Sequence, residues 1–181
     1  MINWLDFCLI LLILIGVTAG YFQGLLRQVM NLASMYLAAI LAAQYYHLLG
    51  SYLGSQLTTT PGGLLNGVSF FVILIGVTGL LNILTYGAYR TTKLTHYPLF
   101  DRTGGMLVGF IAAWILIAMA INVLGVAAST QYWSSAEDFR QLIKSGIAGS
   151  QFAAMSALTL PGILNAIKPW LPMGLPSIFN I

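Results

Sequence analysis

Three long stretches of this sequence contain no charged residue, and they limit its possible folds more than any other feature. No Asp, Glu, Lys or Arg occurs at positions 7–26, 28–89 or 103–136. About 20 apolar residues cross the roughly 30 Å hydrocarbon core of a bilayer, so these stretches have room for four spans. Of the 181 residues, 59% are hydrophobic and only 6% are charged. This composition excludes a water-soluble globule and a disordered chain.

The predicted fold class is an all-α integral membrane protein with four transmembrane helices and a C-terminal amphipathic and interfacial tail. The transmembrane domain is expected over residues 1–128, with spans at about 4–25, 29–50, 64–86 and 104–128. A turn between the second and third spans follows from the threonines, Pro61 and paired glycines, which break helices.

The tail, residues 129–181, differs in composition from the spans. Apolar residues recur there at helical spacing with charged residues between them, which predicts an amphipathic helix over 137–158. The last stretch contains four prolines, so we expect an apolar interfacial segment anchored by Trp170. A short re-entrant helix is the alternative.

Lys and Arg in the short loops predict the orientation. Arg27 follows the first span, and Arg90, Lys93 and Arg102 follow the third, whereas the N-terminal tail and the loop after the second span have none. Because basic loops stay in the cytoplasm, both termini are expected on the extracytoplasmic side. The start of the chain carries Asp6 and no basic residue, which argues against a cleaved signal peptide.

Small residues mark one face of the first span and one face of the fourth. They are Gly16, Gly20 and Gly24 in the first span, and Gly105, Gly109 and Ala113 in the fourth. Small side chains let helix backbones approach closely in lipid, so both faces are predicted to be packing surfaces. Their neighbour is expected within this chain, with another membrane protein or a homo-oligomer as the alternatives.

Two asparagines, Asn82 and Asn122, lie inside predicted spans. Because facing acyl chains is costly for an amide, both are expected to point into the bundle and bond between helices. A rival hypothesis makes them part of a channel or transporter pore, together with Thr78 and Gln44. No charged residue lies deep in a span to couple proton or ion transport.

No catalytic or metal-binding motif is present in the sequence, so neither an enzyme nor a cofactor is predicted. Cys8 is isolated within a span, and the two histidines, His47 and His96, have no ligands at metal spacing. His47 would be the one candidate axial ligand for a pigment or haem, although an interfacial histidine is the simpler interpretation. The charges are too sparse for a nucleic-acid surface. The partners expected are therefore membrane lipids and another membrane protein.

The segment ILIGVT occurs at residues 13–18 and again at 73–78. Each copy lies in the first helix of a predicted helix pair. The echo either reflects a direct repeat of two hairpins or is a coincidence among apolar residues.

Two local patterns resemble the colicin V production protein (CvpA) family. The first is Asn3-x-Leu5-Asp6, followed after the apolar span by Gly20-Tyr21-x-x-Gly24-Leu25-x-Arg27. The second is Leu99-x-Asp101-Arg102-x-x-Gly105-x-x-x-Gly109. Gln28 departs from the family, which often has an acidic residue at that position.

The resemblance implies a bacterial cytoplasmic-membrane protein without established enzymatic activity, linked to toxin production or export and to envelope homeostasis. We therefore expect a scaffold or accessory protein. The alternatives are an accessory subunit of a large bioenergetic or photosynthetic complex, and a small channel or transporter subunit. In the matching residues, Asp101 is suited to cap the fourth span and Arg102 to meet phosphate headgroups.

Overall fold

The computed structural model describes residues 3–56, 62–88, 98–129, 137–171 and 179, and the regular structure there is entirely helical. In chain order the segments are α1 (Trp4–Gln23), α2 (Leu25–Gln56), α3 (Gly62–Ala88), α4 (Pro98–Ser129), α5 (Glu137–Ala148), α6 (Gln151–Ile167) and the 3-10 helix η1 (Lys168–Trp170). The four helices α1 to α4 are long and apolar enough to cross a membrane. The predicted all-α membrane fold class is confirmed.

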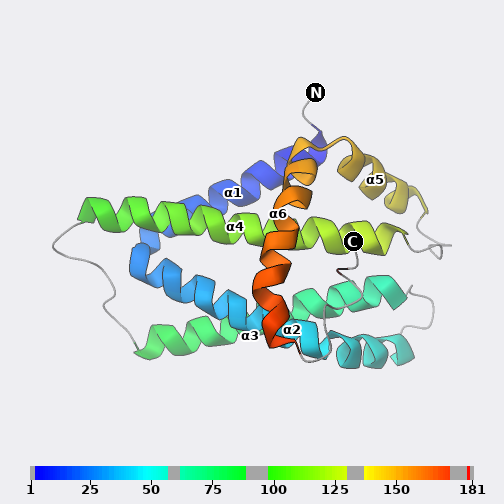
Figure 1. The fold of residues 1–181 in the computed structure, drawn as a ribbon, viewed down its shortest axis with the longest axis horizontal. Helices are drawn as coiled ribbons and strands as arrows, with labels where there is room; N and C mark the ends of the chain where they lie inside the picture. The colour runs from blue at the N-terminus through cyan, green and yellow to red at the C-terminus, as the bar shows by residue number, and fades with distance from the viewer. Residues whose placement is uncertain (1–2, 57–61, 89–97, 130–136, 172–178, 180–181) are drawn as a thin grey trace.

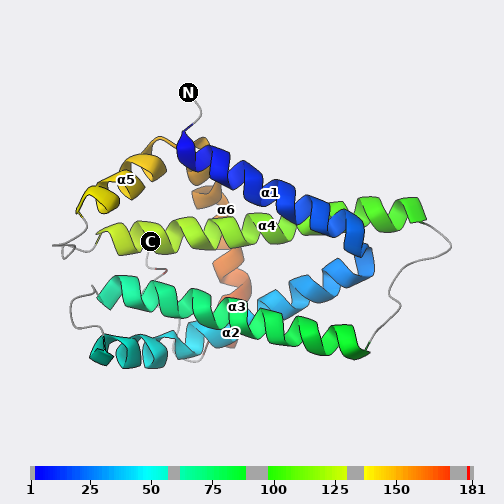
Figure 2. The ribbon, with the colours of Figure 1, turned by 180° about the vertical axis from the view of Figure 1, so that it is seen from behind.

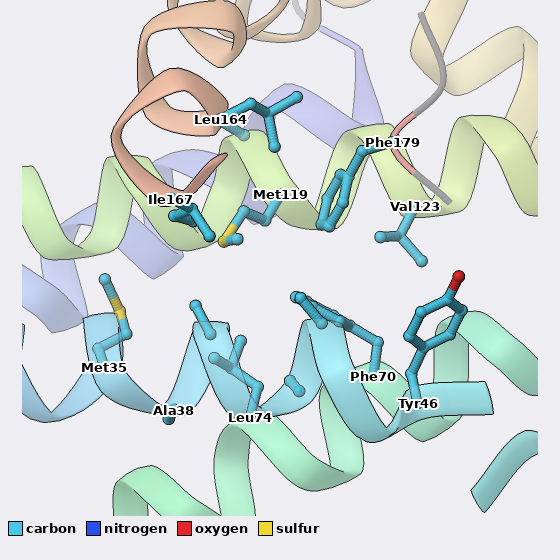
Figure 3. Packing of buried hydrophobic residues seen from close by; sticks show 14 of the residues in the cluster. Met35, Ala38, Tyr46, Phe70, Leu74, Met119, Val123, Leu164, Ile167 and Phe179 are labelled. Atoms are coloured by element: carbon cyan, nitrogen blue, oxygen red, sulfur yellow. The ribbon is translucent and has the colours of Figure 1, made fainter. Parts of the chain in front are cut away.

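The long helices form two close pairs, α1 with α4 and α2 with α3, and α2 also packs on α4 (Figures 1 and 2). Small side chains on α2 permit this approach. The buried alanines there are Ala38, Ala39, Ala42 and Ala43. The largest core cluster lies among α2, α3, α4 and α6, and includes the fully buried Phe70, Leu74 and Met119 (Figure 3). Phe179 closes this cluster with its ring edge-on to Phe70, 5.2 Å between centroids.

The first two helices are separated by Gly24 alone, where a loop was expected around residues 26–28. Gly24 has a φ of +84°, which a residue with a side chain rarely adopts. Arg27 consequently lies in the first turn of α2. At the other connection α4 begins at Pro98 rather than near residue 104, because proline is tolerated in the first turn of a helix.

The tail folds differently from the expectation of one helix over 137–158. Between α5 and α6 the chain bends by 77°. The hydroxyl of Ser150 accepts a hydrogen bond from the Ala153 N–H at 3.0 Å, and so caps a new helix at this bend. α6 then continues through Pro161, which lies inside the helix instead of beyond its end.

The two ILIGVT segments have different surroundings. Gly16 in α1 is pressed against α4, whereas an added Cβ at Gly76 in α3 would meet open space. The close pairs are α1–α4 and α2–α3, not the sequential hairpins α1–α2 and α3–α4. The two ILIGVT segments therefore do not occupy equivalent positions in the helix packing.

Candidate functional site

The six predicted small residues meet in one contact between α1 and α4, which we call the glycine seam. Its members are Gly16, Gly20, Gly24, Gly105, Gly109 and Ala113. A Cβ added at Gly20 would collide with the carbonyl oxygen of Gly105, and one at Gly16 would lie 2.9 Å from the carbonyl oxygen of Gly109. The two backbones are thus in direct contact. The structure places both small-residue faces against each other within the same chain.

Asp101 has a different role from the one expected. It lies inside the first turn of α4, three residues after Pro98, rather than at the N-cap position, and is 4% exposed. Its Oδ1 accepts a hydrogen bond from the backbone N–H of Leu25, the first residue of α2, at 2.9 Å. Its carboxylate also fills the space where Gly24 would carry a Cβ. Asp101 therefore holds the sharp turn between α1 and α2 from the side of α4.

Replacing Asp101 with leucine is expected to lower the free energy of unfolding by about 1–2 kcal/mol, because the Leu25 N–H loses its acceptor. Asp101→Asn keeps an acceptor oxygen and should lose less than half as much. Both values can be measured by unfolding in mixed detergent micelles, followed by circular dichroism. Equal losses in the two variants would contradict the capping role.

Arg102 extends the contact between α1 and α4 beyond the glycine seam. Its Nη1 donates to the hydroxyl of Tyr21 at 3.2 Å, and its guanidinium carbon lies 5.3 Å from the centre of the tyrosine ring. The side chain is exposed, as contact with a lipid phosphate would require. The other basic motif residue, Arg27, is partly buried in α2.

Asp6, the remaining motif residue, lies in a junction at the opposite end of α1. It is 3% exposed, and its Oδ1 accepts hydrogen bonds from the Ser150 hydroxyl at 2.5 Å and the Phe152 N–H at 3.4 Å. Its Oδ2 accepts from the Asn3 N–H at 3.2 Å. The Asn3 side chain in turn donates to the carbonyl oxygen of Gly146 at 2.8 Å. This Asp6 junction fastens the α5–α6 bend to the start of α1.

Asn82 bonds between helices. Its Nδ2 donates to the Oδ1 of Asn31 on α2 at 2.6 Å, and Asn31 donates in turn to Gln28 at 3.4 Å. Gln28, where the sequence departs from the family pattern, is 2% exposed and donates to Gln23 at 3.5 Å. These four amides link the end of α1 and the start of α2 to the second half of α3.

Of the other residues of the hypothetical pore, Thr78 lies one turn before Asn82 on α3, whereas Gln44 is on α2 and Asn122 on α4. Asn122 lines a cavity of about 480 Å³ between α4 and the α5–α6 segment, and its buried Oδ1 has no hydrogen-bond partner among the described residues. Gln44 donates to the carbonyl oxygen of Trp170 at 3.4 Å. The hydroxyl of Thr78 is buried and has no hydrogen-bond partner in the described part of the chain. Asn122 and Gln44 thus face the tail, whereas Asn82 is bonded to α2.

His47 is exposed on α2, and its ring lies 4.3 Å from that of Tyr46. Cys8 is exposed on α1. The described ranges hold no group of three or more His, Cys, Asp or Glu side chains that could bind a metal ion. His96 lies outside the described residues.

The contact of α6 with α4 was missed in the sequence. The indole N–H of Trp114, in the middle of α4, donates to the Thr159 hydroxyl at 3.0 Å. The Tyr36 hydroxyl of α2 likewise donates to the Ala166 carbonyl oxygen at 2.7 Å. The position of Trp114 in the middle of a span could have indicated this contact. An indole N–H inside a membrane needs a hydrogen-bond acceptor, and tryptophans usually lie at the membrane surfaces instead.

α5 carries four of the five charged residues of the tail, all except Lys168. Arg140 and Glu137 form an ion pair at 2.8 Å, and this hydrogen bond holds the pKa of Glu137 below its ordinary value. Ile143 and Gly146 on the opposite side are buried. α5 is therefore amphipathic, and it corresponds to the first half of the amphipathic helix predicted over 137–158.

A groove of about 680 Å³ runs along α3 between α4 and α5, and we call it the α3 groove. Its lining is apolar and includes Val72, Gly76, Leu124 and Phe139. Gly76 and the neighbouring Gly79 are exposed, and a Cβ added at either would meet open space. Unlike the glycine seam, this surface has no described helix packed on it at these two residues.

Comparison with known proteins gives one match. The family model described as "Colicin V production protein" matches residues 5–158, which is most of the chain and includes both sequence patterns except for Asn3. No curated protein and no solved structure matches the chain.

Proposed function

The chain belongs to the colicin V production protein family, and on that premise we propose that it is a non-enzymatic scaffold that docks another membrane protein. The family links this membrane protein to colicin V production. A role in toxin export or envelope homeostasis would follow from docking. The proposed location is the bacterial cytoplasmic membrane, with both termini on the extracytoplasmic side.

The α3 groove is the observation that carries this proposal. Small residues facing lipid allow a second helix to approach closely, and Gly76 and Gly79 are such residues on the face of α3. The apolar groove beside them offers packing surface to the same helix. Since the glycine seam is already occupied within the chain, the α3 groove is the surface that we assign to a partner.

The placement of the polar residues favours a scaffold over a channel. Asn82 is bonded to Asn31, and Gln44 to the backbone at Trp170. Asn122 faces a separate cavity next to α6. A pore would need such groups along one continuous path.

Replacing Gly76 or Gly79 with leucine is expected to remove the partner without unfolding the chain. The added side chain has space in the isolated protein but would block a helix seated in the groove. The protein would be purified from its native membrane in mild detergent, and its complexes weighed by native mass spectrometry. We expect a stoichiometric partner with the unaltered chain and its loss in both variants.

Ala33→Leu is the matched control, because Ala33 is exposed on α2 and lines a different groove. This variant should keep the partner. A lone monomer or homo-oligomer from native membranes, or a partner that survives both glycine changes, would contradict the proposed docking. Flux through proteoliposomes that Asn82→Leu abolishes would favour the channel instead.

A further inference from the structure

α6 crosses the long helices near the middle of the bundle (Figures 1 and 2). Thr159 contacts α4 at Trp114, and Ala166 contacts α2 at Tyr36. On its inner side Leu160, Leu164 and Ile167 are buried in the main core cluster. α6 is therefore an integral part of the helix bundle where it crosses α4 and α2. Its removal would expose the main core cluster.

Exposed apolar side chains lie on α4 to both sides of this crossing. Leu107 is 67% exposed and Leu124 is 39% exposed, on opposite sides of Trp114. Seventeen residues separate them, which is about 26 Å along a helix and close to the thickness of the hydrocarbon core.

α3 shows the same pattern as α4. Val68 and Val72 are exposed towards the start of α3, and Ile83 and Leu84 towards its end. Because side chains like these are stable against lipid or against a partner helix within the membrane, the hydrocarbon layer extends past α6 in both directions.

The outward face of α6 is itself suited to lipid. Leu158 is 83% exposed and Met155 is 56% exposed, and Ala154, Ala157, Pro161 and Gly162 are exposed beside them. No Asp, Glu, Lys or Arg occurs from Ser145 to Ile167. α5, in contrast, carries the charges of a helix that meets water.

Two hydroxyls of α6 form hydrogen bonds within the helix, and its two amide side chains, Gln151 and Asn165, lie near its ends. The hydroxyls of Ser156 and Thr159 donate to the carbonyl oxygens of Ala153 and Ser156, at 2.8 and 3.0 Å. Such bonds within the helix remove the need for water. Lys168 follows at the end of the helix and is exposed, and its long aliphatic stem allows the ammonium group to extend towards the headgroups.

From these observations we propose that α6 is an intramembrane helix, re-entering the hydrocarbon layer from the Asp6 junction and lying across the bundle. Its outward face, centred on Leu158, contacts lipid acyl chains. Only part of the tail then lies at the membrane surface. α5 lies at the water boundary, and α6 forms part of the lipid-facing wall.

Spin labels at single cysteines in proteoliposomes test this placement. In a Cys8→Ser background, labels would be attached to Leu158→Cys on α6, Leu107→Cys on α4 and Ser145→Cys on α5, all at exposed positions. Collision rates with oxygen, which concentrates in hydrocarbon, and with a water-soluble nickel chelate on both sides of the membrane would then be measured.

We expect the Leu158 label to resemble the Leu107 label, with nickel collisions about tenfold rarer than at Ser145 and with high oxygen access. Nickel access equal to that at Ser145 would place α6 at the water surface and overturn the proposal. Protection of the Leu158 label from both reagents would also overturn it, because protein rather than lipid would then cover this face.

Discussion

Replacing Gly20 with leucine is expected to force α1 away from α4 and to lower the free energy of unfolding by about 3 kcal/mol or more. A side chain at Gly20 would run into the backbone of Gly105, which cannot move aside as the end of a flexible side chain can. Reversible unfolding in mixed micelles, followed by circular dichroism, measures the loss.

Gly79→Leu is the matched control for this change, since it adds the same side chain to a transmembrane glycine that faces open space. We expect its unfolding free energy to stay within about 0.5 kcal/mol of the unaltered chain. Similar losses in the two variants would mean that leucine is harmful at any glycine in the spans, and the close contact of the glycine seam would then explain nothing.

Asp6→Ala is expected to detach the α5–α6 bend from α1, at a cost of about 2–4 kcal/mol. The buried carboxylate accepts hydrogen bonds from Ser150, Phe152 and Asn3, and an alanine leaves these donors without their acceptor. Limited proteolysis at the bend should become faster, and the unfolding free energy should fall.

Ser150→Ala and the double variant complete a thermodynamic cycle that isolates the bond between the two side chains. We expect a coupling energy of about 1–2 kcal/mol between Asp6 and Ser150. Asp138→Ala, which removes an exposed carboxylate from α5, should have little effect on stability. Additive losses at Asp6 and Ser150 would show that the hydrogen bond does not couple them.

The sequence was sufficient to predict the parts of the fold that depend on patterns among neighbouring residues. Long uncharged stretches predict the four long apolar helices, and the spacing of Gly16, Gly20 and Gly24 predicts a packing face on α1. These patterns depend on residues three or four positions apart, so one sequence contains the whole signal.

The remaining contacts join residues that lie far apart in the chain. Asp101 was expected to cap its own helix, but it accepts from Leu25, 76 residues away. Ser150 and Asp6 are separated by 144 residues. Nothing in the local pattern around Ser150 reveals that a carboxylate from α1 will reach the bend, and Pro161 is a poor stop signal because α6 is held in place by α4 and α2.

The pairing of α1 with α4 also sets an order of events during synthesis. α1 is made before α4, so its close-packed face stays in contact with lipid or with the insertion machinery until α4 has been synthesised. The turn at Gly24 is likewise unsupported until Asp101 has been made. A chain that stalls before α4 is made therefore exposes the glycine face of α1 to other helices in the membrane.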